Sequence, residues 1–446
     1  MTHGPEPIPK WYRRAHRSVA GLFAAALVAV DPERATTAAL VREGRTLRIG
    51  RQTVTVAGGV LVVGMGKAAA GMALAAERAL GDLVSGGLVV TTDGSAGVVR
   101  PQYIEVLTAA HPLPDERSLR AGGRLLDLVG STGPDDVVIA LISGGGSALA
   151  EALRPPFTFA DLRDVTDRLL RSGATIGELN TVRRAMSRIK AGGLLAQSAA
   201  PVYPLILSDV IGNDLGTIAS GAMIPGPPLA EQLAVALTVL DRYGLGGAIR
   251  ESATALLAVA CESEPAAPRA IQAPVFIGDN ARAVSAAAAE ADGFVVSRPA
   301  GWQDREGEAA ELGRAFARTC RAAGHDVDLV VGGGEATVTV RGAGVGGRNT
   351  EFALAAALAL DADGTADWVV ASLATDGQDG PTGVAGAIAD GETVGRMRSA
   401  GTNPDALLRD NDSLRGFSLA GGLVTTGPTG TNVNDLYIGR RVRRGG

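Results

Sequence analysis

The stretch that decides the fold is Val60-Leu61-Val62-Val63-Gly64-Met65-Gly66-Lys67, which an alanine-rich segment follows up to Leu80. A continuous apolar run that ends in glycines and precedes a helical pattern is typical of a buried parallel strand, a tight turn and a helix. The same order returns at 137–147, which reads VVIALISGGGS, and further apolar runs stand at 87–90, 203–207 and 275–277. Because strands and helices alternate, the sequence predicts a doubly wound α/β domain with a parallel sheet.

Beyond about residue 325 the pattern changes. The apolar run 329–331 enters three glycines, and residues 335–340 then alternate as a strand does rather than as a helix does. We therefore expect a large N-terminal domain over 1–325 and a second, smaller α/β domain over 326–446, with an active-site cleft between them. The segment 262–273 is the best internal linker candidate.

Composition excludes several classes of protein. The 42 Lys and Arg residues against 47 Asp and Glu give a net charge of −5, so nucleic acid is not expected as the main partner. Two cysteines and four scattered histidines cannot build a zinc site or a disulfide framework. The apolar run 19–30 is shorter than the roughly 20 residues that a membrane span takes, and no cleavage site follows it. We expect a cytoplasmic protein with no membrane partner.

The sequence of the first glycine turn is typical of an anion-binding site. Gly64, Gly66 and Lys67 stand between the predicted strand and its helix, where free backbone N–H groups and the positive helix end can hold a phosphate. Lys67 has two interpretations of equal weight, which are a solvated turn lysine and a contact to a phosphate or carboxylate.

The turn does not match two common nucleotide motifs. Leu61 stands where a Walker loop needs its first glycine, and Ala68 replaces the Ser or Thr that would hold magnesium. Ala69 replaces the third glycine of a dinucleotide fingerprint, and the first acidic residue after the next strand is Asp93. A dinucleotide site is therefore disfavoured.

A second turn consists of Ser143, Gly144, Gly145, Gly146 and Ser147. Three glycines let the backbone approach a ligand without interference from Cβ atoms, which favours the cradling of an oxyanion or phosphate. Ser147 fits a helix cap or a ligand donor. The register of the glycines does not fit the nucleophile elbow of a serine hydrolase.

Two more segments of this domain carry candidate residues. Asn180, Arg183 and Lys190 belong to a basic stretch whose spacing places Arg183 and Lys190 on one helix face. The stretch is either a solvated basic helix or a contact for an anionic substrate or nucleotide. Asp209 and Asp214 follow the run 202–207, at the strand end where open α/β sheets bind ligands. They are either helix caps or magnesium ligands.

The C-terminal part holds four polar, glycine-rich loops. Buried backbone of this kind needs polar partners, and functional residues concentrate on loops that a scaffold holds. We expect Arg348 to neutralise anionic oxygens and either Asp376 or Asp379 to orient or deprotonate a hydroxyl group. The candidates in these loops are Glu335, Arg348, Asn349, Asp376, Asp379, Thr429, Asn432 and Asn434.

With these motifs in this order, the chain resembles the glycerate 2-kinase family of the MOFRL type, whose members are sometimes named hydroxypyruvate reductases. The resemblance implies a Rossmann-like domain and a MOFRL domain around a cleft, and transfer of the ATP γ-phosphate to the 2-hydroxyl of D-glycerate with Mg²⁺. It also implies Lys67, Arg348 and Asp376 as active-site residues. The motifs that carry it are 64–69 (GMGKAA), 111–115 (HPLPD), 143–148 (SGGGSA), 208–221, 346–349 (GGRN), 375–382 and 426–435.

The chain departs from the family pattern in two places. The family commonly has Lys-Gly-Gly-Arg-Leu where residues 190–194 read KAGGL. It often has proline where Ala222 stands, and the next residues, 223–228 (MIPGPP), are also unusual. These departures keep another aldonate or a polyol open as the acceptor. An NAD(P)-dependent hydroxypyruvate reductase and a non-catalytic ligand sensor are further alternatives, and a homodimer also stays open.

Overall fold

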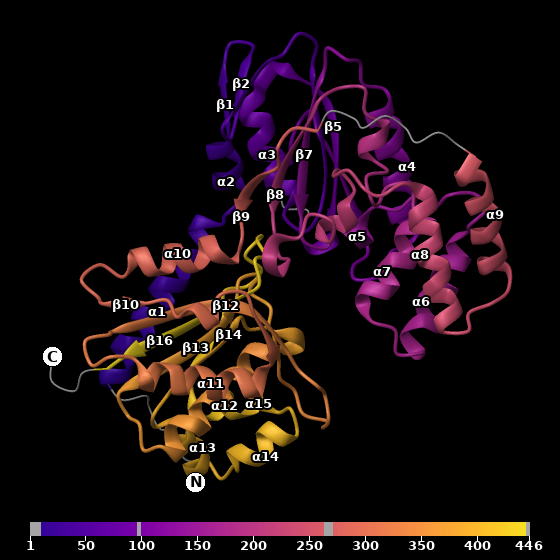
Figure 1. The fold of residues 1–446 in the computed structure, drawn as a ribbon. Coiled ribbons are helices and arrows are strands. Elements are labelled where there is room, and N and C mark those ends of the chain that lie inside the picture. Colours follow the sequence, from indigo (N-terminus) through magenta and orange to yellow (C-terminus); the bar gives the residue numbers. More distant parts are fainter. Residues whose placement is uncertain (1–9, 96–99, 263–270, 443–446) are drawn as a thin grey trace. The chain divides into compact units, whose positions relative to one another are not determined.

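The computed structural model describes residues 10–95, 100–262 and 271–442 and divides into two compact units (Figure 1). The parallel-sheet unit consists of Pro32–Ser208 and Asn213–Ile277. The mixed-sheet unit consists of Met1–Asp31, Asp209–Gly212 and Gly278–Gly446. Residues 263–270 of the expected linker lie outside the described residues.

The parallel-sheet unit is built on six described strands in the order β6-β5-β4-β7-β8-β9. Counted along the chain, this order is 3-2-1-4-5-6, which is the order of Rossmann folds. β4 pairs in parallel with β5 and β7, and all residues of β4 and β7 are buried. The predicted parallel sheet is confirmed. Its strands are β4 (Val60–Met65), β5 (Val84–Thr92), β6 (Glu105–Ala109), β7 (Val137–Ser143), β8 (Val202–Leu207) and β9 (Val275–Gly278).

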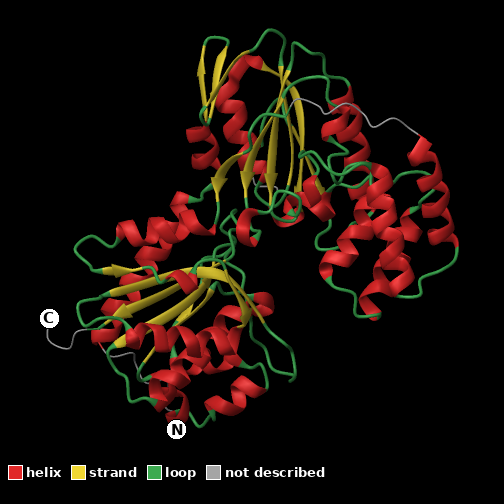
Figure 2. Ribbon diagram, in the orientation of Figure 1, coloured by secondary structure: helices red, strands yellow, loops and turns green. Residues whose placement is uncertain are grey.

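Helices flank this sheet, and a small antiparallel sheet lies beside it (Figure 2). The small sheet is β1 (Leu40–Glu43), β2 (Thr46–Ile49) and β3 (Gln52–Thr55). Asp115, Thr158 and Thr175 start α4, α6 and α7 with capping boxes, in which each side chain bonds to a backbone N–H that the helix leaves unpaired. The helices are α2 (Pro32–Ala39), α3 (Ala69–Leu80), α4 (Glu116–Gly130), α5 (Gly146–Leu149), α6 (Phe159–Arg171), α7 (Ile176–Met186), α8 (Leu229–Arg242) and α9 (Ala248–Glu262), with 3₁₀ turns at Gly81–Leu83, Asp93–Ser95, Leu195–Gln197 and Ile218–Gly221.

Helices α6, α7, α8 and α9 share a hydrophobic core of their own, which includes Leu162, Leu179 and Leu233. The predicted basic helix is shorter than expected, because α7 ends at Met186. The hydroxyl of Ser187 accepts hydrogen bonds from the N–H groups of Ile189 and Lys190, at 3.2 Å each, and turns the chain out of the helix. The prediction that Arg183 and Lys190 share a helix face is therefore wrong.

The mixed-sheet unit has seven described strands, of which six follow the order β10-β12-β16-β13-β14-β15 while β11 pairs with β12. The central pairs β12–β16, β16–β13 and β13–β14 are antiparallel. The strands are β10 (Val296–Ser297), β11 (Arg305–Glu308), β12 (Leu329–Thr337), β13 (Trp368–Ala374), β14 (Gly386–Asp390), β15 (Leu423–Val424) and β16 (Asp435–Arg441).

The helices of this unit come from both ends of the chain. α1 packs on α10, and α11 packs on α12. They are α1 (Lys10–Ala29), α10 (Asn280–Glu290), α11 (Ala309–Ala322), α12 (Arg348–Ala362), α13 (Thr393–Ser399), α14 (Pro404–Arg409) and α15 (Ser413–Ala420), with 3₁₀ turns at Ile211–Asn213, Ala300–Trp302 and Gly380–Thr382.

The glycines 332–334 and Glu335, which the sequence analysis placed in a glycine-rich loop, lie inside β12. A Cβ atom on Gly332 would lie 2.8 Å from Trp302 Cβ, and one on Gly333 would lie 2.0 Å from Asn280 Oδ1. The glycines therefore make room for close neighbours, and a single strand runs through them.

Packing assigns the N-terminal helix and residues 278–325 to the mixed-sheet unit. Tyr12 of α1 donates a hydrogen bond to the carbonyl of Ala366 at 2.8 Å, and His16 Nε2 lies 3.2 Å from Asp390 Oδ2. The domain limits 1–325 and 326–446, and a cleft between domains, stay predictions. Among the helices that the structure describes, none has the length and apolar character of a membrane span.

Candidate active site

The two glycine turns of the parallel-sheet unit follow neighbouring strands. The strand order reverses between β4 and β7, and open α/β sheets bind ligands outside the carboxyl ends of the strands at such a point. Gly66 and Lys67 follow β4, while residues 144–147 follow β7. Strand order therefore brings together two turns that are about eighty residues apart in the sequence.

Hydrogen bonds tie the turns to each other. The N–H of Lys67 donates to the carbonyl of Gly144 at 2.8 Å, and the N–H of Ala68 donates to Ser143 Oγ at 3.0 Å. Gly66 has a φ of +137°, and a Cβ atom there would lie 2.1 Å from Ser143 Oγ. Ser143 therefore positions the start of α3, and only glycine fits at position 66.

His111 and Lys67 flank the second turn. A Cβ atom on Gly145, which has a φ of +83°, would lie 3.0 Å from His111 Cδ2 and 3.5 Å from Lys67 Cγ. Burial, and then the charge of Lys67, lower the pKa of His111, so its ring is neutral at pH 7. His111 belongs to a motif that the sequence analysis quoted, but no role was assigned to it.

Ser147 has a partner that sequence analysis missed. Its Oγ lies 2.8 Å from Ser220 Oγ, and both Ala219 and Ser220 have positive φ angles, of +46° and +55°. Non-glycine residues in this conformation are uncommon and often accompany functional sites. Gly64 and Gly146 have packing roles, because Cβ atoms there would lie 2.5 Å from Leu141 O and 2.9 Å from Ala219 Cβ.

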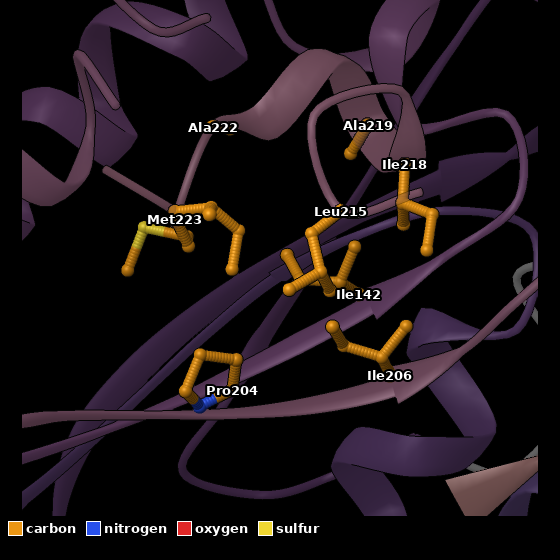
Figure 3. A pocket seen from close by; sticks show the side chains of 9 residues that line it. Ile142, Pro204, Ile206, Leu215, Ile218, Ala219, Ala222 and Met223 are labelled. Carbon is orange, nitrogen blue, oxygen red and sulfur yellow. The ribbon is translucent and has the colours of Figure 1, made fainter. Parts of the chain in front are cut away.

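Two of the residues that depart from the family pattern, Ala222 and Met223, are buried, whereas residues 225–228 are exposed. Ala222 and Met223 line a cavity of about 10 Å³ together with Ile142, Pro204 and Ile206 (Figure 3). This volume is the size of one water molecule. The substitution at 222 therefore changes core packing.

The missing arginine has a similar explanation. A Cβ atom on Gly193 would lie 2.1 Å from the backbone oxygen of Arg188, and Leu194 is fully buried. An arginine side chain does not fit at 193 unless the neighbouring backbone moves, and at 194 it would be buried. The departures at 193, 194, 222 and 223 thus provide no structural support for a larger acceptor, and a larger acceptor rests only on the exposed residues 225–228.

The basic residues of the 180–190 stretch differ in their surroundings. Lys190 is 1% exposed, and its Nζ lies 2.5 Å from Glu151 Oε2, so its charge is compensated inside the unit. Burial lowers the pKa of Lys190, and Glu151 opposes this shift. Arg183 is 7% exposed, and its Nε and Nη2 have no hydrogen-bond partner in the described part of the chain. Asn180 lies half-buried on the same helix as Arg183.

The two aspartates after β8 have separate roles and belong to different units. Asp214 is exposed and accepts hydrogen bonds from Thr217 Oγ1 at 2.5 Å and from the N–H of Gly216 at 3.4 Å. Hydrogen bonding by Thr217 lowers the pKa of Asp214, which matches the capping interpretation. Asp209 accepts Asn432 Nδ2 on its carboxylate at 3.1 Å and Asn434 Nδ2 on its backbone carbonyl at 2.7 Å.

In the mixed-sheet unit, Asp435 holds Arg348 in place. Arg348 begins α12, and its Nε donates to Asp435 Oδ2 at 2.7 Å. Asp435 is fully buried at the start of β16, and its Oδ1 accepts Asn349 Nδ2 at 2.9 Å. Ser372 in turn donates to Asn349 Oδ1 at 2.6 Å. No described residue bonds to the two terminal amines of Arg348, so they can bind an anion.

The sequence left open whether Asp376 or Asp379 orients or deprotonates a hydroxyl group, and the structure gives the two aspartates different surroundings. Asp379 is fully buried and accepts hydrogen bonds from the N–H groups of Asn349 and Thr350, at 2.7 and 2.8 Å, so it caps α12. Burial raises the pKa of Asp379, and these bonds oppose the shift. Asp376 is half-buried on the same loop, and Thr429 secures that loop by donating to Thr375 O at 2.6 Å. Asp376 is thus the better candidate to meet a substrate hydroxyl.

Nearby charges shift the pKa values of Arg348 and of the candidate residue Glu335. Burial alone would lower the pKa of Arg348, but Asp435, Glu335 and Asp376 outweigh it and raise the pKa. Burial raises the pKa of Glu335, Arg348 opposes this shift, and Asp435 and Asp209 add to it. Asp435 itself was missed as a site residue, although it is the acid that ends the quoted motif 426–435.

Comparisons with known proteins agree with this geometry. The MOFRL family matches residues 328–435, and a family described as a domain of unknown function, DUF4147, matches residues 18–258. The D-glycerate 2-kinase of Thermotoga maritima is 38% identical over 85% of this chain and 90% of its own length. The chain belongs to the MOFRL-type glycerate kinase family.

Other relatives bear this out. The glycerate 2-kinase of Pyrococcus horikoshii is 34% identical over 94% of this chain and 95% of its own. An Agrobacterium vitis protein with the provisional name hydroxypyruvate reductase is 40% identical over 93% and 92%. The crystal structure of Thermotoga maritima glycerate kinase covers 96% of this chain and 100% of its own, with 34% identity and a TM-score of 0.83. The glycerate kinase fold thus extends over nearly the whole chain.

Proposed function

We propose that this glycerate kinase family member transfers the γ-phosphate of ATP to the 2-hydroxyl of D-glycerate. The observation that carries the proposal is the Arg348 cluster, in which a buried aspartate fixes an arginine whose terminal amines face no described partner. Phosphoryl transfer needs positioning and charge neutralisation more than covalent chemistry, and such an arginine supplies both.

Each unit contributes a separate part of the proposed chemistry. In the parallel-sheet unit, Lys67 and the N–H groups of residues 144–147 would bind phosphate oxygens. The N–H groups of Gly66, Lys67 and Ala68 do not contribute, because they bond to Val90 O, Gly144 O and Ser143 Oγ. In the mixed-sheet unit, Arg348 would neutralise the transferring phosphate or the carboxylate of the acceptor. Asp376 would accept the proton of the 2-hydroxyl group while that oxygen attacks phosphorus.

Mg²⁺ is proposed as the companion of ATP, where it would neutralise phosphate charge, with Asp209 as the candidate protein ligand. The described residues contain no group of three His, Cys, Asp or Glu side chains that could hold a metal. This fits magnesium, which proteins commonly bind through one or two carboxylates together with substrate phosphates. Asp209 is the better of the two predicted ligands, because hydrogen bonds from the adjoining turn occupy both oxygens of Asp214.

A hydroxypyruvate reductase is the second candidate. The sequence analysis disfavoured a dinucleotide site, but one structural observation supports such a site. Asp93 directly follows β5, which is the strand end where dinucleotide-binding folds place the acid that binds the ribose. However, Arg117 Nη1 lies 2.7 Å from Asp93 Oδ1 and neutralises its charge. Ala69 still replaces the third glycine, so we retain the kinase as the proposal.

Two incubations separate the candidates. Pure protein with ATP, Mg²⁺ and D-glycerate should form ADP, and phosphorus NMR should place the new ester on the 2-hydroxyl. Protein with NADH and hydroxypyruvate should leave NADH unchanged. NADH loss without ADP formation would establish the reductase, and neither signal would favour a ligand sensor.

An acceptor series completes the assignment. Longer aldonates and polyols at fixed ATP and Mg²⁺ should react more slowly than D-glycerate, and a faster one would replace it as the substrate. We also propose a cytoplasmic location, and sedimentation of the pure chain will decide between a monomer and the homodimer.

A further inference from the structure

A second cavity lies in the parallel-sheet unit, between helix α6, the loop that precedes α4 and the α7 residue Arg183. It has a volume of about 580 Å³, which is within the range of small-molecule sites. Its apolar wall includes Leu113, Pro114 and Leu170, of which Leu113 and Leu170 are 58% and 55% exposed. Large exposed apolar side chains that gather at one cavity are typical of a ligand site.

Arg183 forms part of the same wall and is 93% buried. Its Nε and Nη2 have no hydrogen-bond partner among the described residues. The charge of Glu151 acts on it, but this carboxylate is already paired with Lys190 at 2.5 Å. A buried guanidinium whose charge is not compensated is costly, and an anion held at this wall would compensate the charge of Arg183.

The loop that contacts the second glycine turn also lines the cavity. His111 lies against Gly145 beside Lys67, and the cavity wall includes Leu113, two residues later on the same loop. A ligand that reaches both ends of this loop would carry its phosphates at the second glycine turn. Its other end would be apolar and flat, to match Leu113 and Leu170.

We propose that this cavity holds the adenine and ribose of the nucleotide, with the α-phosphate at Arg183. The inference rests on the proposed kinase function, and it places the nucleoside within the parallel-sheet unit. A small hydroxy acid would not fill about 580 Å³, whereas a nucleotide has that size and offers a flat apolar base to Leu113 and Leu170. The wall also includes Asp164 and Asp167, but these acids pair with Arg168 and Arg171 at 3.2 and 3.0 Å and so do not cancel the charge of Arg183.

The test fills the cavity from an exposed position. Ala160→Trp places an indole in the cavity from the surface of α6, and Ala234→Trp makes the same change on the exposed face of α8, away from the cavity. Calorimetric titration with ADP should show an affinity about 10-fold or more weaker for Ala160→Trp, and about wild-type affinity for Ala234→Trp. Titration with inorganic tripolyphosphate should give wild-type affinity for both variants.

Arg183→Gln tests whether the positive charge of Arg183 contributes to phosphate binding. It should weaken ADP and tripolyphosphate alike, by about 10- to 100-fold, because hydrogen bonds to charged groups contribute about 1.5–3 kcal/mol. Thermal melts check its folding, and Ala160→Trp decides the question if Arg183→Gln does not fold.

The outcomes separate this inference from the function. Equal ADP affinity in Ala160→Trp and Ala234→Trp, in a protein that phosphorylates D-glycerate, would overturn the inference and leave the kinase standing. A wild-type protein that neither binds ADP nor forms phosphoglycerate would remove both.

Discussion

The two clusters of candidate residues are built on opposite plans. In the parallel-sheet unit the proposed ligand-binding surface is mainly backbone, made of the glycine turn around Gly145, with Lys67 of the neighbouring turn beside it. In the mixed-sheet unit it is a side-chain network, in which Asp435 and Asp379 hold Arg348 and the start of α12. A backbone cradle tolerates changes in nearby side chains, whereas a network depends on every member. The two clusters should therefore respond differently to single substitutions.

The largest effect is expected for Arg348→Ala. Loss of a preorganised charged contact typically lowers kcat by about 10²–10³, and the variant should keep its fold because Arg348 is partly exposed. Steady-state kinetics with D-glycerate and ATP measure the loss. Arg415→Ala, at an exposed arginine of α15, is the matched control and should behave as wild type. Near wild-type turnover of Arg348→Ala would remove this residue from the site.

Lys67→Ala should lose activity on the same scale or somewhat less, because the backbone N–H groups of residues 144–147 remain to bind phosphate. We expect kcat to fall by about 10²–10³ with a larger rise in KM for ATP than for D-glycerate. The thermal midpoint should stay unchanged. A rise in KM for D-glycerate alone would instead assign Lys67 to the acceptor carboxylate.

Asp435→Asn tests whether Asp435 is a positioning residue. The substitution keeps the shape but removes the charge that orients Arg348, so kcat should fall by about 10- to 100-fold with KM for ATP nearly constant. Asp379→Asn is the comparison, because Asp379 caps α12 and should reduce stability more than kcat. If Asp435→Asn lowers only the thermal midpoint, its role is structural.

The smallest effect concerns His111 and pH. The pKa of His111 is lowered from the ordinary histidine value of about 6.5. The ring is therefore neutral at pH 7.5 and gains a proton only at a pH below that ordinary value. Acidification would then add a positive charge beside Lys67 and tighten phosphate binding by about two- to fivefold. KM for ATP measured from pH 5.5 to 7.5 should show this decrease in the wild type and lose it in His111→Gln. An identical profile in both proteins would show that the ring does not sense the nucleotide.

The sequence alone determined the parallel-sheet unit and most of its turns. Apolar runs such as Val60–Val63 form buried strands because they exclude water on both faces, and glycines at strand ends mark turns whose φ angles other residues rarely adopt. These signals are local and periodic. The order of motifs was likewise sufficient to indicate the family, which the similarity to glycerate kinases over most of the chain confirms.

Only the tertiary structure decided which of the candidate polar residues are buried and paired. Lys190 and Arg183 are both basic and close in sequence, yet one is paired with Glu151 and the other has unpaired nitrogens, because α7 ends at Met186. Asp376 and Asp379 differ in the same way, through burial beneath α12. Burial and pairing depend on contacts between residues that lie far apart along the chain, such as Arg348 with Asp435, and no local pattern carries that information.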